Sequence, residues 1–489
     1  MPDRPRITCG ASILTVLLAA ILAGCGGTAG KPGADSRAAD GGDRVPDAGL
    51  APAERDSFLA SFDVVWRTVL DKHWEPDLGG VDWTGAREEL RPRVAAAQTR
   101  QEARAPMIEL LDRLRQSHFG IIPAEAYAAI EGDLGDDEGA DGDGGVDGDG
   151  DAGLELRVHE GRALVTFVHP EGTAAGRLQP GWLLDRVNGR SVDSLLARVS
   201  ASLADAEHDA AHLNVLLNRT LHNLLAGDRG DTLSVVAIAA GADVIPVALP
   251  LGAAPGERMG LGNLPAQDVW FLQRRLPLHT DAVAGDGRTP DPAGIEGVGY
   301  IRFNFFLDPV RIMGAFQAAV AEYEDAAGLI IDLRGNFGGI GAMAMGVAGF
   351  LVDGPGQRLG TLKTRDMELN FVVNARRPHF AGPVAVLVDG LSMSTAEILA
   401  GGLQDLGRAR VFGTPTPGAA LPSIIARLPS GDGFQYAFAN YVSAGGEALE
   451  GRGVTPDEVV PPDRDALLAG HDPVVRAAVE WIVRERQKG

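Results

Sequence analysis

The sequence has 489 residues, and 45% of them are hydrophobic, which is enough apolar material for two or three domain cores. The formal net charge is −22. Such an acidic chain repels phosphate groups, so we exclude nucleic acid as a partner. The composition therefore allows two or three domains with real cores and argues against a nucleic-acid-binding protein.

The first 25 residues are typical of a lipoprotein signal peptide. Arg4 and Arg6 precede the apolar run 13–22, which is too short to span a bilayer. The run ends in Leu22-Ala23-Gly24-Cys25, which resembles the bacterial lipobox, whose cysteine is lipidated and becomes the new N-terminus. We expect Cys25 to anchor the protein to a membrane of the cell envelope, facing the periplasm or the exterior. The alternative is an ordinary signal peptide that ends in a cysteine by chance.

The next two segments differ sharply in hydropathy. Residues 26–50 are rich in Gly, Ala, Pro and Asp, with almost nothing to bury, and indicate a flexible linker. Residues 51–120 contain apolar residues at helical spacing, including Phe58, Phe62 and Val65. We expect a small N-terminal helical domain over residues 51–120.

Residues 131–151 carry ten acidic side chains, many glycines and no basic residue. Alternating carboxylates and glycines could bind calcium, but the EF-hand spacing with its closing glutamate is absent. Like charges repel and nothing in this segment can pack, so a disordered acidic loop is the better interpretation. We expect neither a metal ion nor a cofactor anywhere in the protein.

Residues 121–255 are predicted to form a β-rich domain that interrupts the chain. The strand 163–168 is followed by Pro180-Gly-Trp182 and by Asn188-Gly189, a pattern that resembles a hairpin of PDZ domains. Trp182 stands where that family usually has Asp. Helical residues follow at 195–225 and closing strands at 232–249. A PDZ-like domain binds extended peptide ends by strand addition, so a peptide is the expected partner.

Residues 256–489 alternate between strands and helices, which predicts an α/β domain. Apolar runs at 298–303, 327–333 and 384–388 read as buried strands. Helical patterns lie between them at 309–323 and 341–352. A last amphipathic helix is expected at 473–486.

Ser394 is the candidate nucleophile. It lies in a turn of small residues that opens into a helix-spaced apolar stretch. Unpaired amides at a helix N-terminus, together with the helix dipole, favour a developing negative charge, as acyl transfer requires. The only lysines are Lys31, Lys72, Lys363 and Lys488, so no lysine follows the serine until the last two residues of the chain. A histidine base is therefore the leading candidate.

Four ordered motifs carry a resemblance to the C-terminal-processing (tail-specific) serine protease family. They are Asp332-Leu-Arg-Gly-Asn336-Phe-Gly338-Gly339, Ser392-Met-Ser394-Thr-Ala-Glu397, Gly413-Thr-Pro-Thr-Pro-Gly418 and Gly451-Arg-Gly453-Val-Thr-Pro456-Asp457. Together with the helical and PDZ-like segments, the resemblance covers most of residues 51–489. It implies an α/β fold with a crotonase-like ββα-spiral protease domain, an N-terminal helical domain and an inserted PDZ-like domain.

One position departs from that family. Ala419 stands where the tail-specific enzymes place their lysine base. A branch that resembles the tricorn protease core uses instead a Ser-His pair at the end of the helical domain, with a glutamate before the last motif. Ser117, His118 and Glu450 match those positions.

The resemblance assigns a role to each of these residues. His118 would accept the proton of Ser394, and Glu450, directly or through Ser117, would orient the imidazole and stabilise its charge. Thr395 N–H and an amide of Gly338 or Gly339 would form the oxyanion hole. We expect the His118 ring to come within hydrogen-bond reach of Ser394.

The sequence therefore predicts a lipid-anchored serine peptidase that hydrolyses exported proteins, near their C-termini, through an acyl-enzyme. Two alternatives explain parts of the pattern differently. A non-catalytic peptide-binding or apolar-ligand-binding lipoprotein could use the same scaffold, with Ser394 as a simple helix cap and His118 and Glu450 as ordinary polar residues. An esterase of the α/β-hydrolase type fits poorly, because no Gly-x-Ser-x-Gly surrounds Ser394.

Overall fold

The computed structural model describes residues 50–126, 149–203, 210–278 and 297–488. The signal peptide with Cys25, residues 26–49 of the linker and residues 127–148, which include most of the acidic segment, lie outside the described residues. Within the described ranges, no helix combines the length and the apolar character needed to cross a membrane.

The N-terminal region is helical, as predicted. Its elements are α1 (Pro52–Lys72), η1 (Leu78–Gly80), α2 (Trp83–Ala96) and α3 (Arg100–Asp112). Asp82 and Thr99 cap the N-termini of α2 and α3 by accepting a backbone N–H with their side chains. Apolar faces of the three helices form one core, which contains Phe58, Phe62 and Val65.

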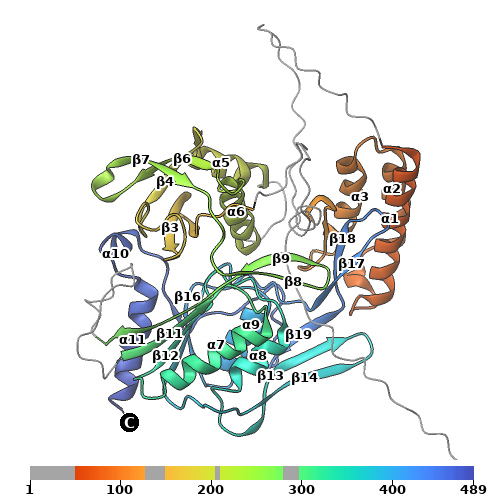
Figure 1. The fold of residues 1–489 in the computed structure, drawn as a ribbon. Coiled ribbons are helices and arrows are strands. Elements are labelled where there is room, and N and C mark those ends of the chain that lie inside the picture. Colours follow the sequence, from red (N-terminus) through yellow and green to blue (C-terminus); the bar gives the residue numbers. More distant parts are fainter. Residues whose placement is uncertain (1–49, 127–148, 204–209, 279–296, 489) are drawn as a thin grey trace, which may run out of the picture.

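This helical core is completed by residues from the far end of the chain. The strand β1 (Gly120–Ile122) pairs with β18 (Gly433–Ala437), which pairs with β17 (Ser423–Arg427). Leu428 and Phe434 of this hairpin pack into the helical core, and Figure 1 shows β17 and β18 beside α1–α3. The helical region is thus tied to the C-terminal part of the chain, a contact that the linear division at residue 120 does not reveal.

Residues 150–252 form a second unit. Its sheet has the order β2-β3-β4-β6-β7, and the short β5 pairs with β4. The bounds are β2 (Leu154–His159), β3 (Arg162–Val168), β4 (Leu183–Val187), β5 (Arg190–Ser191), α5 (Val192–Leu203), α6 (Ala210–Leu224), β6 (Thr232–Ile238), η3 (Ala240–Ala242) and β7 (Val244–Pro250). The strands and helices expected here are present. The PDZ-like interpretation of this unit stays a prediction.

A six-stranded mixed sheet forms the centre of the last domain, in the order β10-β11-β12-β15-β16-β20. Its strands are β10 (Phe271–Pro277), β11 (Gly297–Phe303), β12 (Leu329–Asp332), β15 (Val384–Val388), β16 (Arg410–Gly413) and β20 (Glu458–Val459). The strands from β11 to β20 run parallel, and β10 runs antiparallel at the edge. The α/β prediction is confirmed, whereas the crotonase-like assignment is not tested by this topology alone.

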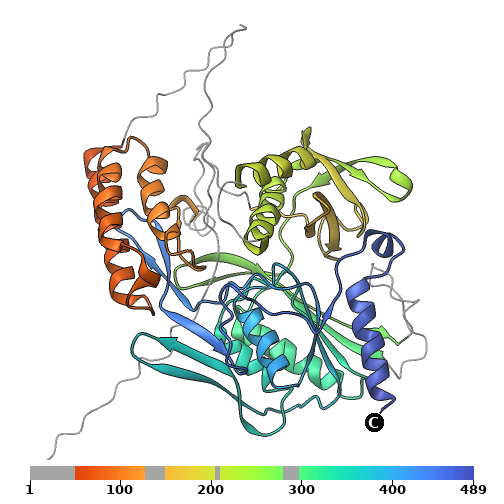
Figure 2. The same cartoon turned by 180° about the vertical axis from the view of Figure 1, so that it is seen from behind.

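Helices cover both faces of this sheet. The helices α7 (Pro309–Glu322), α8 (Gly341–Ala348) and α9 (Thr395–Asp405) lie on one face, and α11 (Pro473–Arg486) lies on the other (Figures 1 and 2). Side chains of a strand alternate between the two faces. Accordingly, Leu329 and Ile331 of β12 face the α7–α9 side, while Ile330 faces α11. Burial on both faces explains why these strands read as continuous apolar runs.

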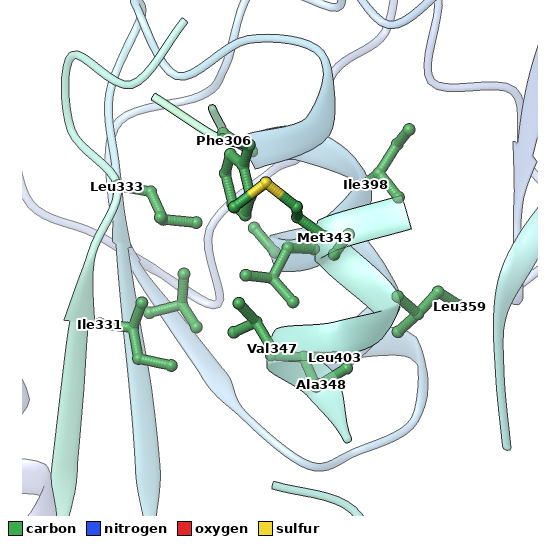
Figure 3. Close-up of a cluster of buried hydrophobic side chains, with 14 of the residues drawn as sticks. Phe306, Ile331, Leu333, Met343, Val347, Ala348, Leu359, Ile398 and Leu403 are labelled. Carbon is green, nitrogen blue, oxygen red and sulfur yellow. The ribbon is translucent and has the colours of Figure 1, made fainter. Parts of the chain in front are cut away.

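The core under α8 and α9 fixes the edge of the sheet that carries the candidate site. Figure 3 shows Met343 and Val347 of α8 and Leu403 of α9 between Leu359 on one side and, on the other, Ile331 of β12 and Leu333 directly after this strand. Because β12 and β15 are parallel, the loops that follow them leave the sheet at the same edge. These two loops contain the glycine motif and Ser394.

The remaining elements surround this domain. Two hairpin-like segments are β8 (Glu257–Leu261) with β9 (Leu264–Val269), and β13 (Pro355–Thr364) with β14 (Glu368–Asn374). The strand β19 (Ala439–Ser443) pairs with β13 and leads into the loop that contains Glu450. The short helix α10 (Arg464–Leu468) packs on the second unit through Leu467.

Candidate active site

Ser394 lies directly before α9, in a backbone conformation that non-glycine residues seldom adopt. Its φ is 55° and its ψ is −115°, and the residue is 5% exposed. Such strain persists only where surrounding contacts enforce it, and it is concentrated at functional sites. Here the Ser394 N–H is held by two acceptors, the Ala419 carbonyl and the Glu397 Oε2, each at 2.9 Å. The side chain is thereby fixed at the N-terminus of α9.

The loop that contains Ser394 is anchored to the glycine motif through Asp389. Asp389 Oδ1 accepts the amides of Gly335 and Leu391 at 2.9 and 3.0 Å, and Arg157 donates to Oδ2 at 2.7 Å. Ser392 Oγ donates to the Leu333 carbonyl at 2.8 Å. Arg157 comes from β2, so the second unit also rests on this loop.

Two backbone amides beside Ser394 have no acceptor among the described residues, and they belong to Gly339 and Thr395. A Cβ at Gly338 would lie 2.7 Å from Ser394 Cβ and 2.9 Å from Thr395 N, so only glycine fits against the nucleophile. The Gly338 amide itself donates to Asn336 Oδ1 at 2.9 Å. Of the two glycines that the sequence left open as oxyanion donors, Gly339 is therefore the one with an available N–H.

Ser117, His118 and Glu450 form one hydrogen-bonded chain. Glu450 Oε1 accepts the Ser117 amide at 2.7 Å, and Oε2 accepts the Ser117 hydroxyl at 2.9 Å. His118 Nδ1 lies 2.6 Å from Ser117 Oγ. His118 is 5% exposed and has a φ of 62°, so it too is held in an unusual conformation.

This chain assigns the tautomer of the imidazole. An ionised carboxylate only accepts, so the Ser117 hydroxyl proton points to Glu450 and its oxygen accepts from His118 Nδ1–H. His118 Nε2 then carries a lone pair; the atom is buried and has no partner among the described residues. Burial lowers the pKa of His118 to about 4 and raises the pKa of Glu450. His118 is therefore neutral at neutral pH, as a general base must be.

A single peptide group connects the two halves of the site. The Ser394 amide donates to the Ala419 carbonyl, and the Ala420 amide of the same peptide group donates to Glu450 Oε2 at 3.1 Å. Ser394 and Glu450 thus bind opposite edges of one peptide group. No hydrogen bond joins His118 Nε2 to Ser394 Oγ in the described structure. The catalytic roles of these residues remain predictions that rest on this arrangement.

Two further residues belong to the site and were not singled out from the sequence. Glu397 accepts hydrogen bonds from the nucleophile loop and from the loop of Ala419. The pattern Ser394-x-x-Glu397 is a capping box, a signal that could have identified it. His73 Nε2 lies 2.9 Å from Gln116 Oε1, and its ring stacks with that of Phe119. These two contacts hold the residues on either side of Ser117 and His118. No sequence signal points to these contacts.

Other predicted features give no additional site. Among the described residues, no group of three or more His, Cys, Asp or Glu side chains is arranged to hold a metal ion. Cys25 lies outside the described residues. Ala419 contributes only its backbone, donating its amide to Glu397 at 3.0 Å.

Two segments of the chain match known protein families. Residues 297–460 match peptidase family S41, and residues 55–111 match the tricorn protease C1 domain. The first match contains Ser394, Glu450 and both glycines, and the second ends shortly before His118.

Curated relatives and solved structures agree with these matches. The carboxyl-terminal-processing protease of Picosynechococcus sp. is 31% identical over 166 residues, which are 34% of this chain and 40% of that protein. The carboxy-terminal-processing protease of Bartonella bacilliformis is 29% identical over 191 residues, 36% of this chain and 42% of that protein. The matched part of this chain thus spans about two fifths of these relatives.

The similar solved structures include a photosystem II D1 C-terminal processing protease, with a TM-score of 0.51, 23% identity and coverage of 86% of this chain and 99% of that one. Mature CPAF has a TM-score of 0.53 at 13% identity, covering 89% and 97%. At these identities the likeness establishes the fold alone. The similarity of this chain to peptidase family S41 thus covers residues 297–460, and its similarity to the tricorn protease C1 domain covers residues 55–111.

Proposed function

We propose that the protein is a serine peptidase that hydrolyses peptide bonds of exported proteins near their C-termini. The observation that carries the proposal is the chain from Glu450 through Ser117 to His118, which leaves Nε2 unprotonated and unpartnered. This chain is linked to Ser394 through the peptide group between Ala419 and Ala420. Available amides of Thr395 and Gly339 beside the serine support it. The alternative of a non-catalytic binding protein gives no reason for this assembled relay.

The proposed reaction uses these groups in order. Ser394 Oγ attacks the scissile carbonyl carbon and passes its proton to His118 Nε2, while Thr395 and Gly339 N–H bind the oxyanion. The imidazolium is stabilised through Ser117 by the Glu450 carboxylate. It then protonates the leaving amine, and an acyl-enzyme forms. Water attacks this ester with His118 as base, which releases the new C-terminus and restores Ser394.

The surroundings of the serine favour an apolar substrate side chain. Phe337, next to Gly338, is 37% exposed and lies 5.8 Å from Phe305 between ring centroids. The exposed ring of Phe337, backed by the partly buried Phe305, offers contact area to a bound peptide. The second unit, if PDZ-like, would hold an extended peptide end by strand addition.

The cellular location is proposed from the lipoprotein-like signal sequence of residues 1–25. We propose that Cys25 is lipidated and anchors the protein to a membrane of the cell envelope, with residues 26–50 as a tether. Growth with an alkyne-labelled fatty acid should label the wild type but not Cys25→Ala. Equal labelling of both proteins would remove the anchor.

A fluorophosphonate probe tests the enzyme proposal. We expect it to label wild-type protein at Ser394, and His118→Ala to abolish labelling because no other base reaches the serine. His159→Ala, at the β2–β3 turn, is the matched control and should label like the wild type. Labelling that survives His118→Ala would remove the base assignment, and an unlabelled wild type would favour the binding protein.

A second assay tests the substrate class. Peptides with a free C-terminal carboxylate should be cleaved in preference to the same peptides with an amidated end. Equal rates would contradict action near C-termini while leaving the nucleophile intact.

A further inference from the structure

The Glu397 carboxylate is fully buried in the first turn of α9 and accepts four hydrogen bonds. Oε1 accepts from Thr416 Oγ1 at 2.6 Å and from the Gly418 amide at 2.8 Å. Oε2 accepts from the Ser394 amide at 2.9 Å and from the Ala419 amide at 3.0 Å. A carboxylate offers about four acceptor positions, so all of them are in use.

These four bonds connect the nucleophile to the segment that binds Glu450. The Ser394 amide belongs to the nucleophile, and Gly418 and Ala419 belong to the segment whose next amide binds Glu450. Thr416 Oγ1 also accepts the Val454 amide at 2.7 Å, which extends the network to the loop after Glu450. Three consecutive backbone amides are thus bound by two buried carboxylates. Glu397 accepts those of residues 418 and 419, and Glu450 accepts that of residue 420.

We propose that Glu397 is a positioning residue of the site, whose ionised carboxylate holds the nucleophile and the Glu450-binding segment in the arrangement that the histidine relay requires. This inference rests on the proposed function. Protonation of Glu397 would put a proton where a donor already points, so at least one of the four bonds would break. Ser394 would then lose its place relative to His118, and displacements of about 1 Å at such sites cost about 100-fold in rate.

The surroundings favour titration of Glu397 in the neutral range. Burial raises its pKa to about 7, the bonds from Thr416, Gly418 and Ser394 act in the opposite direction, and the Glu450 charge raises it further. Helix α8, which packs on α9, has no titratable side chain. The other packed elements carry Arg358 and Lys363 on β13, Arg410 on β16 and Tyr441 on β19, and none of these bonds Glu397. Asp405, at the end of α9 itself, accepts the Gly445 amide instead.

The labelling rate should fall as the pH falls. The ionised Glu397 carboxylate holds Ser394 in place, and this form is lost below a pH of about 7. His118, with its pKa near 4, does not titrate in that range. A decline of labelling rate from pH 8 to pH 5.5 would therefore report a buried carboxylate rather than the base, and loss of the decline in Glu397→Gln would assign it to Glu397.

The experiment measures the fluorophosphonate labelling rate of Ser394 from pH 5 to 9 in full-length protein. The wild-type rate should fall about tenfold per pH unit below about 7. Glu397→Gln should label about 100-fold more slowly at pH 8 and lose this decline, because a neutral amide cannot accept all four donors. Peptide hydrolysis should show the loss in kcat, with KM nearly unchanged. Glu447 is an exposed glutamate in the loop after β19, and Glu447→Gln is the matched control.

A second variant protects the test against misfolding. Thr416→Val removes one stabilising donor and should move the decline to higher pH, which a merely structural role would not do. A flat wild-type profile between pH 5.5 and 8, or a Glu397→Gln protein with the wild-type rate and profile, would overturn the proposal. A wild-type protein that is unlabelled at every pH would instead contradict the proposed peptidase function.

Discussion

The nucleophile and its candidate base are held by two different kinds of structure. Ser394 sits on loops of one α/β domain, fixed by short-range bonds to Glu397 and to the Ala419 carbonyl. His118 follows a helical region that is tied to the C-terminal part of the chain through the β1–β18 pairing and the bond between Ser117 and Glu450. The nucleophile is thus positioned from within its domain, and the base is positioned by docking of a separate region.

The docking contact contains a buried ion pair. Arg104 of α3 donates to Asp432, between β17 and β18, at 2.7 Å, with side chains 13% and 0% exposed. Asp432 also accepts the Ala124 amide at 2.9 Å. By contrast, the nucleophile loop is held by bonds within its own domain, to the nearby carboxylates of Glu397 and Asp389. A substitution far from Ser394, in the contact between the helical region and the β17–β18 hairpin, should therefore be able to displace His118.

The largest effect should come from the nucleophile itself. Ser394→Ala should abolish probe labelling and lower kcat by about 10⁶-fold, as loss of a nucleophilic serine does elsewhere. Ser392→Ala, two residues earlier, loses the bonds of its hydroxyl to the Leu333 carbonyl and to the Asp389 amide, and should cost about 1–3 kcal/mol of stability while still being labelled. Equal peptide hydrolysis by Ser394→Ala and the wild type would place the nucleophile elsewhere.

Loss of the acid at the end of the relay should cost less. Glu450→Gln removes the charge that stabilises the imidazolium and fixes the His118 tautomer, so we expect kcat to fall about 10³–10⁴-fold. Single-turnover hydrolysis of a peptide ester would measure the effect. A change of less than tenfold would show that Glu450 is only structural.

The docking contact gives the third test. Arg104→Leu leaves Asp432 buried without its partner and should lower stability by about 3–5 kcal/mol. Arg93→Leu breaks an exposed pair with Glu109 and should cost less than about 1 kcal/mol. Urea unfolding followed by tryptophan fluorescence compares the two. If the docked helical region, which precedes His118, is less stable than the α/β domain, labelling of Ser394 in Arg104→Leu should decline at urea concentrations where the α/β domain is still folded.

His118 and Glu397 should change the free energy of unfolding in opposite directions as the pH changes. The folded pKa of His118, about 4, lies below its ordinary 6.5, so this residue makes stability fall as the pH drops from 6.5 to 4. The folded pKa of Glu397, about 7, lies above its ordinary 4.5, so this residue makes stability fall as the pH rises from 4.5 to 7. Each effect amounts to about 3 kcal/mol, and the two oppose each other where they overlap.

Two variants expose these opposing slopes. Between pH 4.5 and 6.5, Glu397→Gln should become more stable relative to the wild type as the pH rises, and His118→Gln should become less stable. Urea midpoints at three pH values would measure both slopes. Parallel curves for all three proteins would contradict the burial of these groups.

The same contrast explains what the sequence could predict. The strands 298–303 and 384–388, the last helix and the position of Ser394 follow from local patterns, and they are confirmed as elements. Burial on both faces of the sheet leaves continuous apolar runs that are easy to recognise. Ser117, His118 and Glu450 were reached only through a family resemblance, because about 330 residues separate the relay's two ends and no periodicity encodes their contact.

What the sequence did not show lies in tertiary contacts. Phe434 and Leu428 complete the helical core from the far end of the chain, and Arg104 pairs with Asp432. An isolated Arg or Asp carries no signal of its distant partner. The choice between Gly338 and Gly339 also required the structure, because it depends on the Asn336 side chain that occupies one of the two amides.

The most direct test of the central claim is a crystal structure of the protein with a peptidyl phosphonate bonded to Ser394. We expect His118 Nε2 to lie within about 2.6–3.2 Å of a phosphonate or serine oxygen, with Nδ1 still bonded to Ser117 and the phosphonyl oxygen on the amides of Thr395 and Gly339. An imidazole that stays out of reach of the modified serine, with Glu450 still bonded to Ser117, would contradict it.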